Sequence, residues 1–258
     1  MIIWLVSYPR SGNTFVRSVL NHYFGIKSHS VYGDPIDIGS NPRLAALVGH
    51  EEGRCETFDL PAMRASALTF PIKSHALPGG YVSPADTIFY INRDGRDASV
   101  SYFRYLQSHR KDKTFTLPDV LTGKVRFGFW GNHILQWHRA GFSRMYHFAF
   151  EEITKSPEAF ADELASVLGK QRSNKQFPDL ATFRCSAPEF FGAGHVGSFA
   201  DIFDGNDSAL FELFSGPAMR IAGYWPRQLS MRELEAYAAL CKSLQNDSTN
   251  EQPGSFRV

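Results

Sequence analysis

The sequence predicts a single α/β domain with a central, mostly parallel β-sheet flanked by helices. Two observations predict this fold: short apolar runs rich in β formers end at turns, and the turns open stretches with helical spacing. Strands that alternate with helices in this way usually form parallel sheets. A chain of 258 residues, 43% of them hydrophobic, can bury the core of one such unit, so residues 1–258 are expected to form one domain.

The individual elements follow from local patterns. Strands are predicted by the apolar or alternating runs Ile2–Val6, Phe70–Pro78, Thr87–Asn92 and Met145–Phe150. Helices are predicted in the amphipathic stretch that Ser7–Phe15 opens, over Ala98–Ser108, through Phe129, His133 and Trp137 on one face, and over Pro157–Gly169 between a first-turn Pro and a terminal Gly. Gly25–Asp59 and Gln107–Val125 are expected to be irregular, and Gln245–Val258 a frayed polar tail.

The segment Ser7–Phe15 is a strand, a tight turn and a helix start, which is the geometry of an anion site. The first amide hydrogens of a helix lack intrahelical partners, and the helix dipole adds positive potential. Gly12 lets the backbone approach a ligand, Arg10 is a permanent cation, and Ser11, Asn13 and Thr14 offer polar contacts. A loop that merely caps a helix would have a similar sequence, so this alternative stays open.

A second junction follows the predicted strand Thr87–Asn92. Asp94 can cap the next helix, while Arg93 at the strand end and Ser101 about two turns later could reach one phosphate. The alternative is that Arg93, Asp94, Arg96 and Asp97 only form local ion pairs at a helix start.

The two junctions together resemble the cytosolic-type sulfotransferases that use 3′-phosphoadenosine-5′-phosphosulfate (PAPS). Tyr8–Phe15 resembles their 5′-phosphosulfate loop, Y-P-[KR]-S-G-x-T-[WF], and Tyr90–Tyr102 resembles their 3′-phosphate motif, R-[ND]-x-[KR]-D-x-x-x-S-x. The resemblance spans most of residues 1–225 and implies a P-loop-NTPase-like fold with PAPS as the sulfuryl donor. The chain has no Walker A motif, and no Lys follows Gly12, so ordinary ATP chemistry is disfavoured.

The resemblance also implies the catalytic residues. Lys73-Ser74-His75 stands where the family has K-[ST]-H, which gives His75 the role of general base and Lys73 the stabilisation of charge. Arg10, a permanent cation in the first turn, is also expected to stabilise charge. These residue types suit an in-line sulfuryl transfer, because a neutral imidazole can take the acceptor's proton while fixed cations face the leaving phosphate.

The expected adenine and 3′-phosphate contacts depart from the family pattern. Phe15 and Phe183 are candidates to pack on adenine, and Phe150 replaces a family Tyr that helps to hold it. The family's R-K-G is replaced by Gly192-Ala193-Gly194. We expect the amide hydrogens of this segment to bind the phosphate, with Arg184 or His195 as a compensating cation. The alternative is that the 3′-phosphate is bound more weakly than is usual in the family.

Composition limits the partners. A net charge of +1 shows no broad basic surface for nucleic acid, and a small-molecule acceptor with a hydroxyl or amine group is expected. The apolar start of about eight residues is too short for a signal peptide or a membrane anchor, so the cytoplasm is the expected location. Cys55, Cys185 and Cys241 lack metal-ligand spacing. No metal is expected, because fixed cations meet the charge and no second carboxylate follows a strand to hold Mg²⁺. A homodimer is possible.

Tyr32, Tyr81, Phe103, Tyr105 and Phe115 could line the acceptor pocket, or could belong to the core or surface. Two other functions compete with a sulfotransferase. A nucleotide kinase-like phosphotransferase would need a Lys after Gly12 and an Asp that holds Mg²⁺; a catalytically silent nucleotide-binding protein would explain the missing R-K-G.

Overall fold

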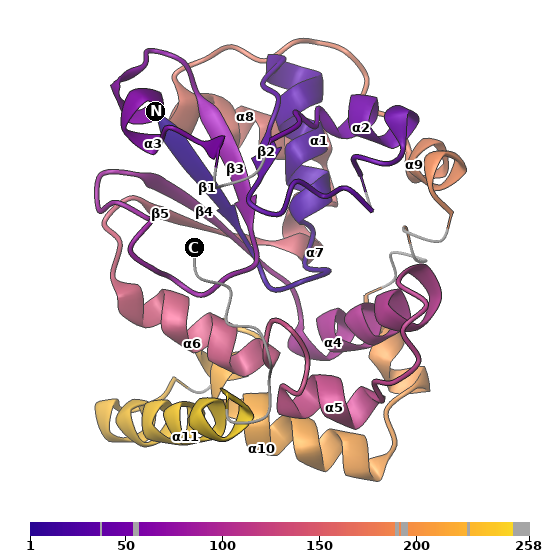
Figure 1. Cartoon of the computed structure of the whole chain (residues 1–258), viewed down its shortest axis with the longest axis vertical. Helices are drawn as coiled ribbons and strands as arrows, with labels where there is room; N and C mark the ends of the chain where they lie inside the picture. Colours follow the sequence, from indigo (N-terminus) through magenta and orange to yellow (C-terminus); the bar gives the residue numbers. More distant parts are fainter. Residues whose placement is uncertain (37, 54–56, 189–190, 192–195, 226–227, 250–258) are drawn as a thin grey trace.

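The protein is built around a sheet of five parallel strands in the order β2-β3-β1-β4-β5 (Figure 1). The computed structural model describes residues 1–249 except 37, 54–56, 189–190, 192–195 and 226–227. The strands are β1 (Ile2–Val6), β2 (His29–Ser30), β3 (Phe70–Ser74), β4 (Thr87–Asn92) and β5 (Met145–Ala149). The predicted α/β fold is confirmed, and every strand pair of this sheet is parallel.

The central strand β1 is buried on both faces, and its alternating residues enter two different cores. Trp4 and Val6 pack in the core with α4 (Gly95–Arg104), α5 (Leu117–Thr122), α6 (Trp130–Ala140), α10 (Gly205–Ile221) and α11 (Met231–Thr249). Ile3 and Leu5 pack on the other face, with α1 (Asn13–Phe24) and α8 (Pro157–Leu168). This period of two is what a strand between two helical layers requires.

The remaining elements connect this frame. They are α2 (Pro42–Val48), α3 (Leu60–Ala65), the π-helical turn η2 (Tyr105–His109), α7 (Phe150–Ile153), α9 (Leu180–Ser186) and the 3₁₀ turn η3 (Ser198–Asp201).

Several stretches predicted to be irregular contain regular structure. β2 and α2 lie within residues 25–59, and α5 lies within residues 107–125. The helix α11 continues to Thr249, so residues 245–249 are helical and not a frayed tail, while residues 250–258 lie outside the described part. These elements are short or polar, and such segments give weak periodic patterns in a sequence.

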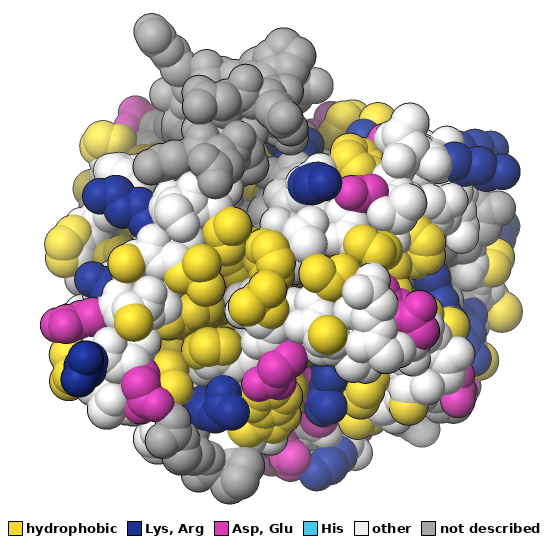
Figure 2. All heavy atoms as spheres, turned by 90° about the horizontal axis from the view of Figure 1, so that it is seen from below, with side chains coloured by type: hydrophobic (Ala, Val, Ile, Leu, Met, Phe, Trp, Pro, Cys, Tyr) yellow, Lys and Arg dark blue, Asp and Glu magenta, His cyan; other side chains and the backbone are white. Residues whose placement is uncertain are grey.

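The face below the sheet, where α10 and α11 lie, carries apolar side chains gathered across its centre (Figure 2). Leu213 on α10 and Met231 and Leu240 on α11 are exposed. Within the described residues, every helix is too short or too polar to cross a membrane.

Candidate active site

The turn after β1 brings the backbone to the start of α1 in an unusual conformation. Arg10 and Gly12 both have positive φ angles, 66° and 105°, and Gly12 is the residue that precedes the helix. A Cβ atom at Gly12 would lie 2.6 Å from the Phe150 ring. Gly12 is therefore required both by its φ angle and by the ring beside it.

The turn and the start of α1 leave hydrogen-bond donors without a partner among the described residues. No side chain caps the N-terminus of α1, and its first turn contains no acidic residue. The Ser11 hydroxyl is buried and has no hydrogen-bond partner among the described residues. A buried polar atom without a partner is rare and costly, so its presence beside helix-terminal amide hydrogens fits a phosphate or sulfuryl group.

The two motifs lie side by side because β1 and β4 are neighbours in the sheet. The Nε of Arg10 donates to the Ser101 hydroxyl on α4 at 3.3 Å. Arg93, directly after β4, donates from Nη1 to the Arg10 carbonyl oxygen at 3.3 Å. The guanidinium of Arg93 also lies 4.8 Å from the centre of the Phe150 ring. Arg10, Arg93 and Ser101, predicted from separate motifs, thus form one polar cluster.

Asn13 and Thr14 lie in the first turn of α1, but the Asn13 side chain points into the protein. Its Nδ2 donates to the Leu5 carbonyl oxygen at 2.8 Å and to the Ser7 hydroxyl at 3.3 Å. The carboxamide therefore ties α1 to the end of β1. Its Oδ1 is buried with no partner among the described residues, and its backbone N–H is the donor that the helix start leaves for a ligand.

His75 follows β3 and is bonded to the segment that leads into the turn. Its Nδ1 lies 2.7 Å from the Ser7 carbonyl oxygen and 3.3 Å from the Ser7 hydroxyl. A carbonyl oxygen can only accept, so Nδ1 carries the proton and Nε2 carries the lone pair. Burial, and then the nearby Lys73 ammonium, lower the pKa of His75 well below its usual value. The ring is therefore neutral near pH 7.

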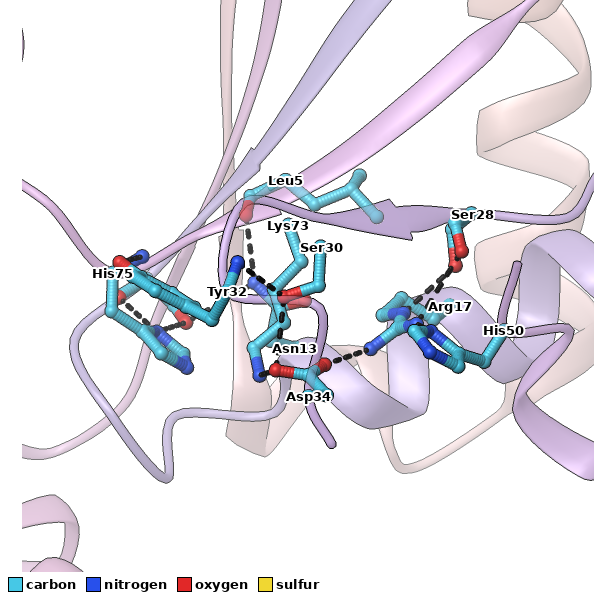
Figure 3. A network of polar contacts seen from close by, with 11 residues as sticks. Leu5, Asn13, Arg17, Ser28, Ser30, Tyr32, Asp34, His50, Lys73 and His75 are labelled. Atoms are coloured by element: carbon cyan, nitrogen blue, oxygen red, sulfur yellow. Dashed lines mark hydrogen bonds and ion pairs between the residues drawn. The ribbon is translucent and has the colours of Figure 1, made fainter. Parts of the chain in front are cut away.

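Lys73, on the same strand, is bound within the protein. Its Nζ donates to Asp34 at 2.9 Å, and the other carboxylate oxygen of Asp34 accepts from Arg17 at 3.1 Å. Figure 3 shows Asp34 in the middle of this network, with Tyr32 and His75 at one end and Arg17 and His50 at the other. The ammonium expected at the reacting centre thus has a carboxylate partner inside the protein.

The three aromatic candidates for adenine lie in two places. Phe150 faces Gly12 and Arg93 at the polar cluster. Phe15 and Phe183 both contact Phe177, with ring centres 5.6 and 5.8 Å apart. Phe15 also stacks on Phe160. Phe177 therefore joins Phe15 and Phe183 in one aromatic cluster on the α1 and α8 side.

The predicted 3′-phosphate segment is described only at its end. Gly192, Ala193, Gly194 and His195 lie outside the described residues, and Arg184 lies half-buried on α9. The residues that follow are held by Asp97 of the second motif, which accepts from the Gly197 N–H at 2.7 Å and the Phe199 N–H at 3.0 Å. Asp97 thus fixes the chain just after this segment against α4.

The acceptor-pocket candidates separate into two groups. Tyr32 stacks against His75 with ring centres 6.0 Å apart, and Tyr105 lies under the Arg10 guanidinium at 5.5 Å. Tyr81 packs on Trp4, while Phe103 and Phe115 pack against the core that α4, α5, α6, α10 and α11 form below the sheet, called the lower core. Tyr32 and Tyr105 are therefore the two candidates beside predicted catalytic residues.

Sequence reasoning missed Arg17, Asp34 and the acceptor role of Asp97. Arg17 carried a signal, because it interrupts the apolar face of α1 and a buried Arg requires an acidic partner. Its partner Asp34 gave none, because it lies in a stretch without periodicity. Within the described residues, no group of three or more His, Cys, Asp or Glu side chains could hold a metal ion.

These features define a class of protein. An anion site at a strand–turn–helix junction of a parallel sheet, with a second basic junction on the neighbouring strand, is typical of α/β proteins that bind phosphorylated nucleotides.

The comparisons with known proteins identify the family. The model of the sulfotransferase domain matches residues 2–187, so the chain belongs to the sulfotransferase family, and the predicted enzyme class is confirmed. Human sulfotransferase 4A1 is 24% identical over 235 residues, which cover 82% of this chain and 78% of that protein. Mouse sulfotransferase 2B1 is 23% identical over 250 residues, 91% of this chain and 68% of that protein.

Solved structures agree with this assignment at the level of the fold. Mouse sulfotransferase SULT7A1 complexed with PAP has a TM-score of 0.60 and 20% identity, covering 92% of this chain and 88% of that chain. Retinol dehydratase in complex with retinol and PAP has a TM-score of 0.56 and 15% identity, covering 99% of this chain and 83% of that chain. The predicted P-loop-NTPase-like sulfotransferase fold is confirmed.

Proposed function

We propose that the protein transfers the sulfuryl group of PAPS to a hydroxyl or amine of a small-molecule acceptor. One observation carries the proposal: His75 is bonded to Ser7, in the segment that leads to the turn where Arg10, Ser101 and Arg93 meet. A base and two phosphate-type motifs are thereby joined at one edge of the sheet. The solved relatives that contain PAP support a PAPS donor.

Residues of both motifs would hold the nucleotide. The helix-terminal amide hydrogens of residues 11–14, the Ser11 hydroxyl and Arg10 suit the 5′-phosphosulfate, and Arg93 and Ser101 suit the 3′-phosphate. Phe150, beside Arg93, offers an apolar surface to the adenosine, as do Phe15 and Phe183 on the α1 and α8 side. The segment Gly192–Gly194 stays a prediction for the rest of the 3′-phosphate contacts. When bound, PAPS supplies the sulfuryl group and a phosphate as leaving group.

His75 would act as the base through Nε2. The bond from Nδ1–H to Ser7 fixes the tautomer, so that the lone pair is at Nε2, and the lowered pKa keeps the ring neutral. The acceptor's proton would move to Nε2. The resulting imidazolium would then be stabilised by the Ser7 carbonyl oxygen at Nδ1.

Arg10 would stabilise negative charge without giving up a proton, because a guanidinium stays protonated near neutral pH. Lys73 would contribute positive potential from its place beside Asp34. Tyr32 and Tyr105 would present aromatic surface to the acceptor, and the retinol and androsterone found in relatives are small apolar molecules of the kind such a surface suits.

Calorimetry with adenosine 3′,5′-bisphosphate, 5′-AMP and ATP with Mg²⁺ tests the nucleotide. We expect adenosine 3′,5′-bisphosphate to bind most tightly, because both motifs then have a phosphate to bind. Preference for ATP with Mg²⁺ would instead favour the phosphotransferase alternative.

Transfer itself is tested with PAPS labelled in the sulfuryl group and a panel of phenols, alcohols, amines and sugars. Labelled product is expected for at least one acceptor class. Tight binding of adenosine 3′,5′-bisphosphate without transfer to any of them would favour the silent nucleotide-binding alternative.

The homodimer and the cytoplasmic location stay predictions. Light scattering after size-exclusion chromatography would measure the mass of the particle against the 29.0 kDa chain.

A further inference from the structure

The loop that follows β2, residues 31–34, contacts both Lys73 and His75, and is called the β2 loop here. The Tyr32 hydroxyl accepts the backbone N–H of His75 at 2.9 Å, and the two rings stack. Two residues later, Asp34 binds the Lys73 ammonium. One short loop thus holds the backbone of the proposed base and the charge of the neighbouring cation (Figure 3).

Asp34 is the centre of the network and accepts from three side chains. Lys73 and the Ser30 hydroxyl donate to Oδ1, each at 2.9 Å, and Arg17 donates to Oδ2 at 3.1 Å. The side chain of Asp34 is 3% exposed and that of Lys73 is 10% exposed. Burial alone would raise the pKa of Asp34, but Lys73 and Arg17 hold it far below the usual value. Asp34 is therefore a permanent anion.

Arg17 anchors this carboxylate from the far side. Its side chain is fully buried, and its Nε donates to the Ser28 hydroxyl at 2.8 Å. Its Nη2 lies 2.8 Å from Nδ1 of His50, and since a guanidinium can only donate, that nitrogen must accept. Burial and the Arg17 charge lower the pKa of His50, in agreement with a neutral ring. Arg17 is therefore held in place by Ser28 and His50 as well as by Asp34.

Burying these three charged side chains costs free energy, which suggests that the network has a functional role. Two cations and one anion are buried together, and such groups are often no more stable than apolar replacements. Asp34 also has a φ angle of 43°, next to Gly33 at 67°, and non-glycine residues adopt positive φ angles only under constraint. Strain and buried charge at a loop that touches a proposed base are typical of functional sites.

We propose that Asp34 is a positioning residue for sulfuryl transfer: anchored by Arg17, its carboxylate holds the Lys73 ammonium beside His75 and fixes the β2 loop on the base. This inference rests on the proposed function and adds to it two residues, Arg17 and Asp34, that lie outside the sequence motifs. Without the carboxylate, Lys73 loses its partner and the β2 loop loses its anchor.

The test compares Asp34→Asn with Asp86→Asn. Asp86 is also a buried carboxylate with an Arg partner, Arg64 at 2.8 Å, but it precedes β4, at the opposite end of the sheet from His75. We expect Asp34→Asn to lower kcat by about 10²-fold, the cost of roughly 1 Å of misplacement at a reacting group. Its affinity for adenosine 3′,5′-bisphosphate should change less than about threefold, which is at most about half of a tenfold step in free energy. Asp86→Asn should change neither.

A second measurement separates positioning from a loss of stability. Burial and the Lys73 ammonium on β3 lower the pKa of His75 most, and His133 on α6 lowers it further. The Ser7 carbonyl oxygen and the Asp34 carboxylate on the β2 loop raise this pKa, and the Tyr32 ring stacks on the imidazole. Asp34→Asn should therefore lower the pKa of the His75 imidazole, which NMR measures directly. The acid limb of the pH profile of kcat should move to lower pH for the same reason. Asp86→Asn should leave both where they are.

Each outcome decides. Unchanged kcat and an unchanged His75 titration in Asp34→Asn would overturn the positioning role, as would equal losses in the two Asn variants. Failure of the wild-type protein to transfer label from PAPS would overturn the proposed function instead, whatever the variants do.

Discussion

At the scale of single residues, the site depends on which side-chain atoms already form hydrogen bonds within the protein. Ser7 fixes the tautomer of His75, Leu5 and Ser7 accept from Nδ2 of Asn13, and Asp34 accepts from Lys73. The Ser11 hydroxyl is buried with no partner among the described residues. Residue type alone could not separate these cases, because the same side chain can face a ligand or the protein interior.

His75→Ala should reduce turnover by about 10² or more while affinity for adenosine 3′,5′-bisphosphate stays nearly the same, because a base serves the chemical step. Steady-state rates with labelled PAPS and calorimetry measure the two quantities. His138→Ala, at an exposed position on α6, is the control and should keep full turnover. Equal turnover in His75→Ala would remove His75 from the mechanism.

Arg93→Ala should weaken binding of adenosine 3′,5′-bisphosphate more than binding of 5′-AMP. Loss of a charged hydrogen bond costs about 1.5–3 kcal/mol, which corresponds to roughly 10–150-fold in affinity. Calorimetry with both nucleotides measures the preference. Arg144→Ala, just before β5 at the opposite end of the sheet, should leave it unchanged. If Arg93→Ala still prefers adenosine 3′,5′-bisphosphate to 5′-AMP as strongly as the wild type does, another group binds the 3′-phosphate.

At the scale of elements, strand–turn–helix junctions were the most predictable part. Asp94 caps α4 as expected, by accepting from the Arg96 N–H, and α8 begins at Pro157 and is capped by Gly169. Arg10 and Arg93 could be placed together because carboxyl ends of adjacent parallel strands share one edge of the sheet. β2 could not be predicted, since a two-residue strand has no measurable alternation. The network around Asp34 depends on that strand and was missed with it.

Gly12→Ala should disrupt the turn and the nucleotide site together. The new Cβ would lie 2.6 Å from the Phe150 ring, and φ is 105°. Gly169→Ala is the matched control, because Gly169 also has a positive φ, 61°, but nothing lies within 4 Å of its Cβ position. Urea unfolding should show a cost of about 1 kcal/mol for Gly169→Ala and a larger one for Gly12→Ala. Equal costs and intact nucleotide binding in both variants would contradict the role of the Phe150 contact.

At the scale of the whole molecule, the fold class was predictable, and so was the place of His133 on the core face of its helix. The layers follow from the alternation of Trp4 and Val6 with Ile3 and Leu5 on a central strand. His133 lies in the lower core with no exposed surface, its Nδ1 2.7 Å from the Tyr90 hydroxyl. Burial lowers the pKa of His133 to about 3. A histidine with this pKa makes the stability of the protein depend on pH.

We expect the free energy of unfolding to fall as the pH is lowered from 7.5 to 5.5. The unfolded chain takes up a proton at His133 near pH 6.5 while the folded protein does not, so acid favours unfolding. One such histidine contributes about 1.4 kcal/mol over this window. His133→Gln should reduce the pH dependence by that amount in urea titrations, and the exposed His138→Gln should not. An unchanged slope in His133→Gln would mean that His133 is protonated in the folded state.

The position of β1 in the middle of the sheet has a consequence for how the protein is made. β1 finds its two neighbours only when β3 and β4 have been synthesised, more than 60 residues later. Phe150, which closes on Gly12, is translated later still. A growing polypeptide therefore carries the turn after β1 without a complete binding site until Phe150 has been added, and it acquires affinity for nucleotide in step with the assembly of the sheet.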